Sequence, residues 1–322
     1  MVHHLSRRAL IAAGVGLTAA RRATAQETMP RFSYPMGIPG NPLGDGLLIR
    51  HGYAVENIPY YPGWWHTGEN WHAIGGESAG LNVYAVADGE VQFVGGDYPG
   101  RVIIVAHAPD LYSMYGHLDY AVLVEEGQIV RRGQPIATIL RWPDDPARSH
   151  LHFELRTFLV ADAINGTAPQ YGVTCGYECP PGPGYWPMTA PEHPSALGWR
   201  NPTHVINRRA WPDGIPVGTM AVVSQSAPSR VLLWSVPGDR PDAKLRGNLD
   251  LAAGDRYPLL EIVSGDEAAT GTSAEAYRLW YRIGLPDGDA WVQAAVPDAS
   301  YAGSDGRPAA VRLAFLPAVI TG

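Results

Sequence analysis

Four histidines have neighbours and spacings that suit metal-dependent chemistry. His66 stands in His-Thr-Gly-Glu-Asn, His117 in Tyr-Gly-His-Leu, and His150 and His152 form His-Leu-His. Side chains alternate faces along a β-strand, so His150 and His152 can serve one site, with Leu151 and Phe153 facing the core. A catalytic zinc takes three protein ligands and a water whose pKa it lowers toward neutrality. The pattern indicates hydrolysis, although strand histidines also serve as ordinary hydrogen-bonding residues.

The chain around these histidines has the pattern of short strands joined by turns. Apolar runs at residues 82–86, 90–94 and 101–106 are separated by turn signals such as Asp88-Gly89, and the rhythm continues to residue 140. The composition agrees, since 37 Gly, 29 Pro and only 17% charged residues favour turns over long surface helices. We predict an all-β fold with an antiparallel β-sheet around the site.

The histidine motifs and the segments between them resemble the lysostaphin-type zinc metallopeptidases. The matching blocks keep their order and spacing and are His66–Trp71, residues 80–91, Tyr115–Leu118, residues 127–136 and His150–Glu154. The resemblance implies that His66, Asn70 and His152 bind Zn²⁺. It implies that His117 and His150 polarise the attacking water and stabilise the oxyanion. The implied reaction is hydrolysis of peptide bonds in bacterial peptidoglycan.

Asn70 departs from the family pattern, which has an aspartate at this position. An amide offers the metal only a carbonyl dipole, so this site should hold zinc more weakly than one with a carboxylate. We keep Asn70 as the predicted ligand, with His72 as the alternative, and expect Glu69 to point to the other face. The second functional hypothesis is a degenerate peptidase fold that binds peptidoglycan or regulates another cell-wall hydrolase.

Other residues near these motifs each allow more than one interpretation. Glu154 either orients a ligand histidine or forms an edge salt bridge. Trp64, Trp65 and Trp71 form core or cleft walls, or stack on a glycan ring, in which case the domain would be a carbohydrate- or surface-binding module. Structural roles are predicted for four further histidines, with the first of them near the cleft: His107, His51, His193 and His204.

The beginning of the chain has the pattern of an export signal. Arg7-Arg8 precedes a weakly apolar stretch of about half the ~20 residues that span a bilayer, and Ala23-Thr24-Ala25 suits a signal peptidase. We predict a twin-arginine-type signal peptide at residues 1–25, with an uncleaved anchor as the alternative. The mature chain is then exported to the periplasm, cell wall or outside, without stable membrane insertion.

Four further segments are predicted after the signal peptide. They are an extended lead-in at 26–60, a lysostaphin-type peptidase domain at 61–160, a Pro/Gly-rich connector at 161–215 and a small β-barrel domain at 216–322. Runs such as residues 251–255 and 279–283 in the last segment resemble a bacterial SH3-like domain. This resemblance implies wall binding, with a role as a spacer as the alternative.

Charge and cysteine content restrict the partners. A formal net charge of −7 provides no basic field for phosphates, so nucleic acid is not expected as a partner. Cys175 and Cys179 are the only cysteines, and in an exported chain they suit a small disulfide. Half of a zinc site and two free thiols are the alternatives. The oligomeric state is left open.

Overall fold

The computed structural model describes residues 30–37, 47–58, 61–74, 77–96, 98–171, 179–268, 277–302 and 308–319. The predicted signal peptide and Cys175 lie outside these ranges, whereas Cys179 is disulfide-bonded. The described part consists mostly of antiparallel strands, which confirms the predicted all-β class. Its helices are the α-helix α1 (Pro202–Arg208) and the 3-10 helix η1 (Pro146–Arg148). Neither is long and apolar enough to cross a membrane.

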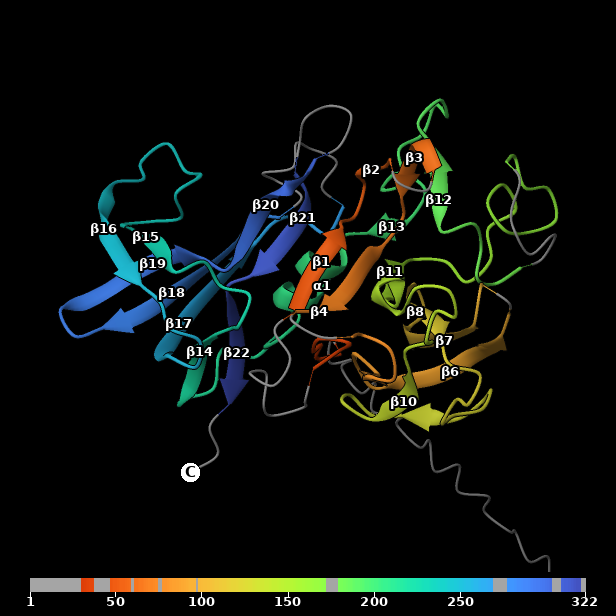
Figure 1. Cartoon of the computed structure of the whole chain (residues 1–322), viewed down its shortest axis with the longest axis horizontal. Helices are drawn as coiled ribbons and strands as arrows, with labels where there is room; N and C mark the ends of the chain where they lie inside the picture. Colours follow the sequence, from red (N-terminus) through yellow and green to blue (C-terminus); the bar gives the residue numbers. More distant parts are fainter. Residues whose placement is uncertain are drawn as a thin grey trace, which may run out of the picture.

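The largest sheet has ten strands and joins segments that are far apart in the sequence. Nine of them follow the order β20 (Ala295–Ala302), β21 (Pro308–Leu313), β1 (Leu47–His51), β4 (Glu69–Ala73), β11 (Leu151–Arg156), β8 (Leu111–Leu118), β7 (Arg101–Ala108), β6 (Gly89–Gly95) and β9 (Ile129–Val130), and β13 (Trp199–Arg200) also pairs with β11. Figure 1 shows the blue strands β20 and β21 beside the orange strands β1 and β4. The sheet therefore crosses the predicted segment boundaries.

Two small sheets flank the large one. β3 (Tyr61–His66) lies between β2 (Glu56–Asn57) and β12 (Tyr185–Pro187), and β5 (Asn82–Tyr84) pairs with β10 (Pro135–Thr138). Thus the predicted lead-in contributes strands β1 and β2. The predicted connector contributes β12, β13 and α1. Tyr185 of β12 pairs with His66, so this connector segment lies directly beside the predicted site.

A second β region is present after residue 215, as predicted. It is a seven-stranded antiparallel sheet in the order β16 (Leu245–Asp250), β15 (Arg230–Trp234), β19 (Gly288–Gln293), β18 (Leu279–Leu285), β17 (Arg256–Ser264), β14 (Thr219–Val223) and β22 (Phe315–Val319). Figure 1 shows it at the left of the molecule. Its identity as an SH3-like domain stays a prediction.

The strand β11 shows how the sequence pattern positions the site. Its apolar residues Leu151, Phe153 and Leu155 belong to the main core, as the alternation predicts. The residues that alternate with them, His152, Glu154 and Arg156, are also buried but lie on the opposite face. One face of this strand therefore stabilises the sheet, while the other presents polar side chains in a region closed to solvent.

Candidate metal-binding and catalytic site

Three predicted ligand residues converge on one point. His152 Nδ1 lies 3.1 Å from His66 Nε2 and 3.2 Å from Asn70 Oδ1. Register explains the last contact, because His152 of β11 and Asn70 of β4 are directly opposite each other in the sheet. His66, the last residue of β3, approaches from the small sheet. All three side chains are buried, so the convergence occurs in a poorly solvated place.

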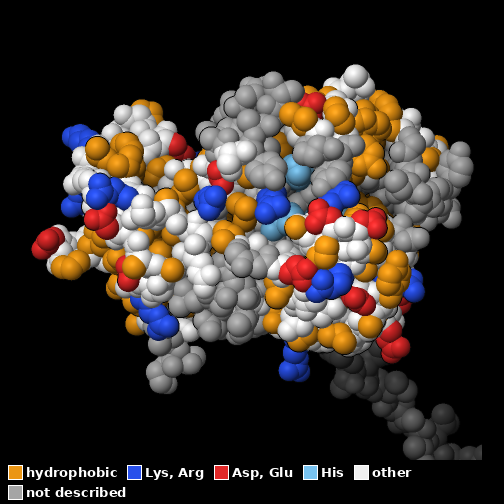
Figure 2. Space-filling view, viewed as in Figure 1, with side chains coloured by type: hydrophobic (Ala, Val, Ile, Leu, Met, Phe, Trp, Pro, Cys, Tyr) orange, Lys and Arg blue, Asp and Glu red, His pale blue; other side chains and the backbone are white. Residues whose placement is uncertain are grey.

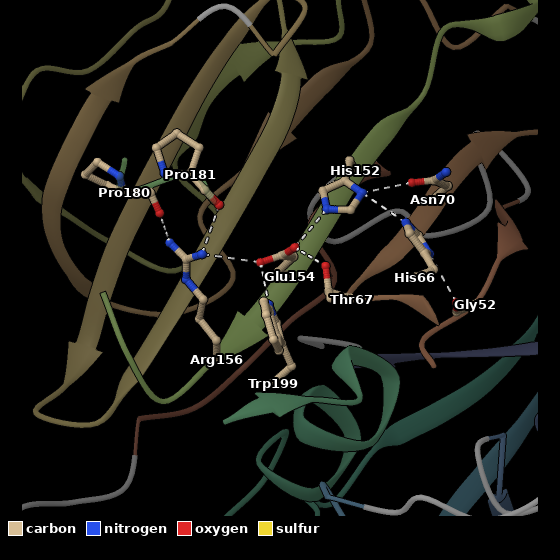
Figure 3. A network of polar contacts seen from close by, with 10 residues as sticks. All are labelled: Gly52, His66, Thr67, Asn70, His152, Glu154, Arg156, Pro180, Pro181 and Trp199. Atoms are coloured by element: carbon tan, nitrogen blue, oxygen red, sulfur yellow. Dashed lines mark hydrogen bonds and ion pairs between the residues drawn. The ribbon is translucent and has the colours of Figure 1, made fainter. Parts of the chain in front are cut away.

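Hydrogen bonds on the far side of each ring explain which nitrogen faces this point. His66 Nδ1 donates to the carbonyl oxygen of Gly52 at 3.1 Å, so the Nε2 atom of His66 is unprotonated and carries a lone pair. His152 Nε2 donates to Glu154 Oε1 at 3.1 Å, so the Nδ1 atom of His152 is unprotonated and carries a lone pair. Figure 3 shows both rings between these outer acceptors and the shared point. Two nitrogen lone pairs and an amide oxygen thus face one another.

This donor set fits a zinc ion. Three acceptor atoms at these distances repel one another unless a cation or proton lies between them. Ligands about 2.1 Å from a tetrahedral zinc lie roughly 3.4 Å apart, close to the observed separations. No group of three or more His, Cys, Asp or Glu side chains in the described part of the chain is arranged to hold a metal. A metal at this point would therefore depend on the amide of Asn70.

Burial keeps the imidazoles of His66, His117 and His150 neutral. Desolvation, aided by the neighbouring histidines, holds the pKa of His66 and of His117 well below the ordinary value. Burial likewise lowers the pKa of His150 to about 4. Neutral imidazoles are the form that binds metals and accepts protons.

His117 and His150 form a second pair beside the three ligands. Their ring centroids are 4.7 Å apart, and His117 lies 6.2 Å from the ring of His152. His117 Nδ1 donates to the carbonyl oxygen of Pro99 at 3.1 Å, and His150 Nδ1 to that of Arg148 at 2.6 Å. Each Nε2 atom is then a free acceptor. The structure thus brings together all five residues that the sequence pattern selected.

Glu154 is the centre of a buried network behind His152. It accepts hydrogen bonds from Thr67 Oγ1 at 2.6 Å and from Trp199 Nε1 at 3.0 Å, besides His152. Arg156 lies 3.5 Å from it and donates to the carbonyl oxygens of Pro180 and Pro181. Burial raises the pKa of Glu154, but these hydrogen bonds and charges together hold it below its ordinary value. Glu154 therefore combines an orienting contact with a buried ion pair, and the predicted salt bridge is not at an edge.

The alternative ligands point elsewhere. His72 stacks on His150 with ring centroids 5.1 Å apart, outside the three-ligand point. Glu69 faces away, as expected, and accepts from Thr203 Oγ1 at 2.7 Å and Trp71 Nε1 at 3.1 Å. Asn70 is thus the residue of its segment that contacts the ligand histidine His152.

The remaining singled-out residues have structural surroundings. His107 bonds the carbonyl oxygen of Asp88 and Ser113 Oγ, and it lies apart from the site cavity, contrary to the expected position near the cleft. Trp71 is fully buried in the core, while Trp64 and Trp65 are half-buried outside the cavity lining. His51 ends strand β1, His204 lies in α1, and the ring of His193 contacts Trp65.

A cavity of about 260 Å³ opens beside the five residues. Its walls include Tyr61, Tyr98, Trp142, Arg148 and Tyr185, which the sequence pattern did not select. They come from loops, from η1 and from the small β3–β12 pair, where no periodic signal marks a functional residue. Figure 2 shows histidine side chains near the middle of one face, with basic and acidic side chains around them. His117 and His150 line the cavity and are each 8% exposed, so the site is reached through this cavity.

Comparison with known proteins agrees with this geometry. Residues 66–167 match Peptidase family M23. The uncharacterized lipoprotein YgeR of Escherichia coli (strain K12) is 38% identical over 94 residues, which are 28% of this chain and 36% of that protein. The murein hydrolase activator NlpD of the same strain is 40% identical over 81 residues, 24% of this chain and 21% of that protein. The chain thus spans about a third or less of these two relatives.

Lysostaphin from Staphylococcus simulans is a similar solved structure, with 13% identity, coverage of 89% of this chain and 99% of that one, and a TM-score of 0.36. The lipoprotein NlpD of Yersinia enterocolitica is 40% identical over 82 residues, which are 24% of this chain but 80% of that protein. Together with the family match at residues 66–167, this similarity shows that the chain belongs to peptidase family M23.

Proposed function

We propose that this chain is an exported zinc-dependent endopeptidase that hydrolyses peptide bonds of bacterial peptidoglycan. The observation that carries the proposal is the convergence of His66 Nε2, Asn70 Oδ1 and His152 Nδ1, with both rings oriented by hydrogen bonds on their far sides. Membership in the M23 peptidases and similarity to a murein hydrolase activator support the reaction and the substrate class. The twin-arginine pattern supports export.

His66, Asn70 and His152 are the residues that would hold the zinc. Zinc, when bound there, supplies a water of lowered pKa and polarises the substrate carbonyl. The amide of Asn70 lacks the full negative charge of an aspartate, so the protein neutralises less of the metal charge. We therefore expect weaker zinc binding than in a site with a carboxylate at this position.

His117 and His150 provide the proton transfer. Each ring is neutral, and each Nε2 lone pair is free to accept the proton of the attacking water. The protonated ring then donates a hydrogen bond to the oxyanion that forms on the carbonyl, or a proton to the leaving amine. The carbonyl oxygens of Pro99 and Arg148, which accept the Nδ1 protons, stabilise the transient positive charge.

A second candidate function is regulation of another cell-wall hydrolase without catalysis. Asn70 favours it, because the weakened ligand set is the one departure of the site from the family pattern. The name of the curated relative, murein hydrolase activator, points in the same direction. In this case the cavity binds peptidoglycan and cleaves nothing.

Elemental analysis of the purified protein, paired with a peptidoglycan digestion assay, separates the two functions. The variants are Asn70→Asp and His152→Ala, and the matched control is His193→Ala, a histidine outside the cavity lining. About one zinc per chain with new peptide ends, both lost only in His152→Ala, supports the peptidase. Absence of zinc and cleavage in the wild type, with both gained in Asn70→Asp, supports the regulator.

A further inference from the structure

We propose that a second cavity binds an anionic amphiphile, a molecule that joins an oxyanion head, carboxylate or phosphate, to an apolar body. The cavity has a volume of about 450 Å³, within the roughly 300–1,000 Å³ that is usual for small-molecule sites. None of its described lining residues also lines the cavity beside His117 and His150. The inference therefore goes beyond the proposed function and does not rest on it.

The apolar part of the wall is built by segments that are far apart in the sequence. Phe32 and Met36 come from the segment before β1. Ile206 comes from α1, and Leu316 and Val319 come from β22. Burial of apolar surface against these side chains favours a ligand with an apolar body.

The segment before β1 is held in place by backbone hydrogen bonds on both sides. Phe32 N donates to the carbonyl oxygen of Arg209 at 3.0 Å, directly after α1. Ser33 N donates to the carbonyl oxygen of Val86 at 2.8 Å, after β5. Phe32 also belongs to the main core. This wall of the cavity is therefore part of the packed fold.

Two cations line the cavity. Arg31 and Arg132 are the charged residues of its described lining. Burial, and after it the positive charge of Arg132, lower the pKa of Arg31. The two guanidinium groups are thus close enough to repel each other, and an anion bound between them would relieve this repulsion.

The guanidinium groups keep donors for a ligand. Arg31 Nε donates to the carbonyl oxygen of Ala210 at 2.7 Å, and the guanidinium carbon lies 5.3 Å from the ring centroid of Trp211. Neither the Nη atoms of Arg31 nor the guanidinium of Arg132 contacts a carboxylate in the described part of the chain. The indole N–H of Trp211 is buried and also has no hydrogen-bond partner among these residues. Unpaired donors at one wall favour an oxyanion.

Two carboxylates belong to a neighbouring cavity instead. Asp88 Oδ1 accepts the backbone N–H of Arg132 at 2.7 Å. Asp88 and Asp213 line a different cavity, which shares Arg31 and Trp211 with this one. The described walls of the proposed site therefore carry two positive charges and no negative charge.

Guanidinium chemistry defines the head group of the ligand. The planar fork of N–H donors pairs with the oxygens of a carboxylate or a phosphate, and it does so while stacked on an aromatic ring. Arg132 is exposed to solvent, so its own effect on affinity is about 5-fold. A neutral amphiphile of the same length lacks this contribution.

The test measures binding to the full chain by calorimetry with decanoate, decyl phosphate, decanol and inorganic phosphate. Decanol has the apolar body without the charge, whereas inorganic phosphate has the charge without the apolar body. The variant is Arg132→Gln, and the matched control is Arg131→Gln. Arg131 is the preceding residue, is also exposed and does not line the cavity, so its replacement removes the same charge from the same place in the chain.

We expect the wild type and Arg131→Gln to bind decanoate or decyl phosphate at least about 5-fold more tightly than decanol or inorganic phosphate, and Arg132→Gln to lose about 5-fold in affinity. Tighter binding of decanoate indicates a fatty-acid-like ligand and tighter binding of decyl phosphate a lipid phosphate, and either result supports the inference.

Three results overturn the inference. They are absence of binding of both charged amphiphiles, decanol or inorganic phosphate bound as tightly as the charged amphiphiles, and equal affinities of Arg131→Gln and Arg132→Gln. None of these results depends on whether the chain cleaves peptidoglycan, so the proposed function and this inference stand or fall separately.

Discussion

At the scale of single residues, Glu154 decides which nitrogen of His152 faces the ligand point. Its carboxylate is fully buried and accepts the Nε2 proton, so the lone pair stays on Nδ1. The other donors to Glu154, from Thr67, Trp199 and Arg156, hold the carboxylate in one orientation. The tautomer of a ligand residue thus depends on three side chains that do not reach the metal point.

Replacement of Glu154 by Gln should lower zinc affinity by about 10- to 100-fold. A glutamine has an NH₂ group in place of one carboxylate oxygen, and this group cannot accept from the surrounding donors. The amide therefore no longer offers the ring of His152 an acceptor in one fixed position. The ¹⁵N chemical shifts of His152 in metal-free protein should change from one tautomer to a mixture. Glu267→Gln is the control, since Glu267 pairs with Arg209 away from the site. Unchanged shifts together with wild-type affinity would show that Glu154 has only a structural role.

His117 has an unusual backbone. It adopts a φ of 60°, a value shared among the described non-glycine residues only by Ala54 at 54°. Left-handed backbone costs an ordinary L-residue about 1 kcal/mol, whereas glycine adopts it freely. This strain occurs at the end of β8, at a side chain that lines the cavity. A glycine at position 117 would adopt this backbone conformation without strain and would stabilise the fold more. The presence of a histidine supports a functional role of its side chain.

We expect His117→Gly to be more stable than His117→Ala by about 1 kcal/mol, because only alanine retains the strained conformation. Both variants lose the imidazole and should lose hydrolysis alike. The free energy of unfolding in urea measures the first effect and the digestion assay the second. Equal stabilities of the two variants would mean that the backbone relaxes at this position without cost.

At the scale of elements, periodic strands were predictable and short paired ones were not. The alternation in β11 predicted which residues face the core and which face the site. By contrast, β1, β12 and β13 fall in segments that were interpreted as lead-in or connector. These strands have two to five residues, and their neighbours come from distant parts of the chain. A local pattern therefore carries little information about them.

The candidate site likewise has residues that the sequence predicted and contacts that it could not predict. His66, Asn70, His117, His150 and His152 were found from their motifs. Gly52 and Arg148 act through backbone carbonyl groups, which any residue type possesses, so residue identity gives no signal for these contacts. The aromatic walls of the cavity are contributed by loops and by the short strands β3 and β12, whose positions depend on tertiary packing.

The helix α1 illustrates a pH dependence that belongs to one element. His204 is fully buried there, and its Nδ1 donates to the carbonyl oxygen of Asp266 at 2.8 Å. Burial lowers its pKa to about 4. An unfolded chain has the ordinary value of about 6.5, so between these values the unfolded state binds a proton that the folded state refuses. The contribution of neutral His204 to the free energy of unfolding is fully present above pH 6.5 and is lost as the pH falls toward 4.

His204→Gln, which cannot titrate, should remove this part of the acid sensitivity. The variant is destabilised at pH 7 by its imperfect packing, but the difference from the wild type should shrink by about 2 kcal/mol at pH 5. Urea unfolding at the two pH values measures this change. The contributions of the other histidines cancel in the difference between the two free energies of unfolding, because both proteins contain them. A difference that is the same at both pH values would contradict neutral burial of His204.

At the scale of the whole molecule, the second β region is joined to the peptidase sheet through one core. Strand β21 pairs with β1, and Tyr277, Tyr281 and Leu313 belong to the same buried cluster as Trp71 and the apolar face of β11. Tyr277 packs against Gly52 so closely that a Cβ on that glycine would lie 1.0 Å from the tyrosine hydroxyl oxygen. Gly52 in turn accepts the Nδ1 proton of His66. The C-terminal region therefore supports a ligand residue from behind.

This contact predicts that Gly52→Ala impairs the site at a distance from it. Either Tyr277 or the end of β1 must move to admit the methyl group, at a cost of about 1–3 kcal/mol. Movement of β1 displaces the carbonyl that orients His66, so zinc affinity should fall by at least about 10-fold. Tyr277→Phe is the control. Its hydroxyl has no hydrogen-bond partner among the described residues, so its removal should keep both stability and zinc affinity. If Gly52→Ala loses stability but binds zinc as the wild type does, Tyr277 absorbs the movement and the C-terminal region stabilises the peptidase sheet without positioning its ligands.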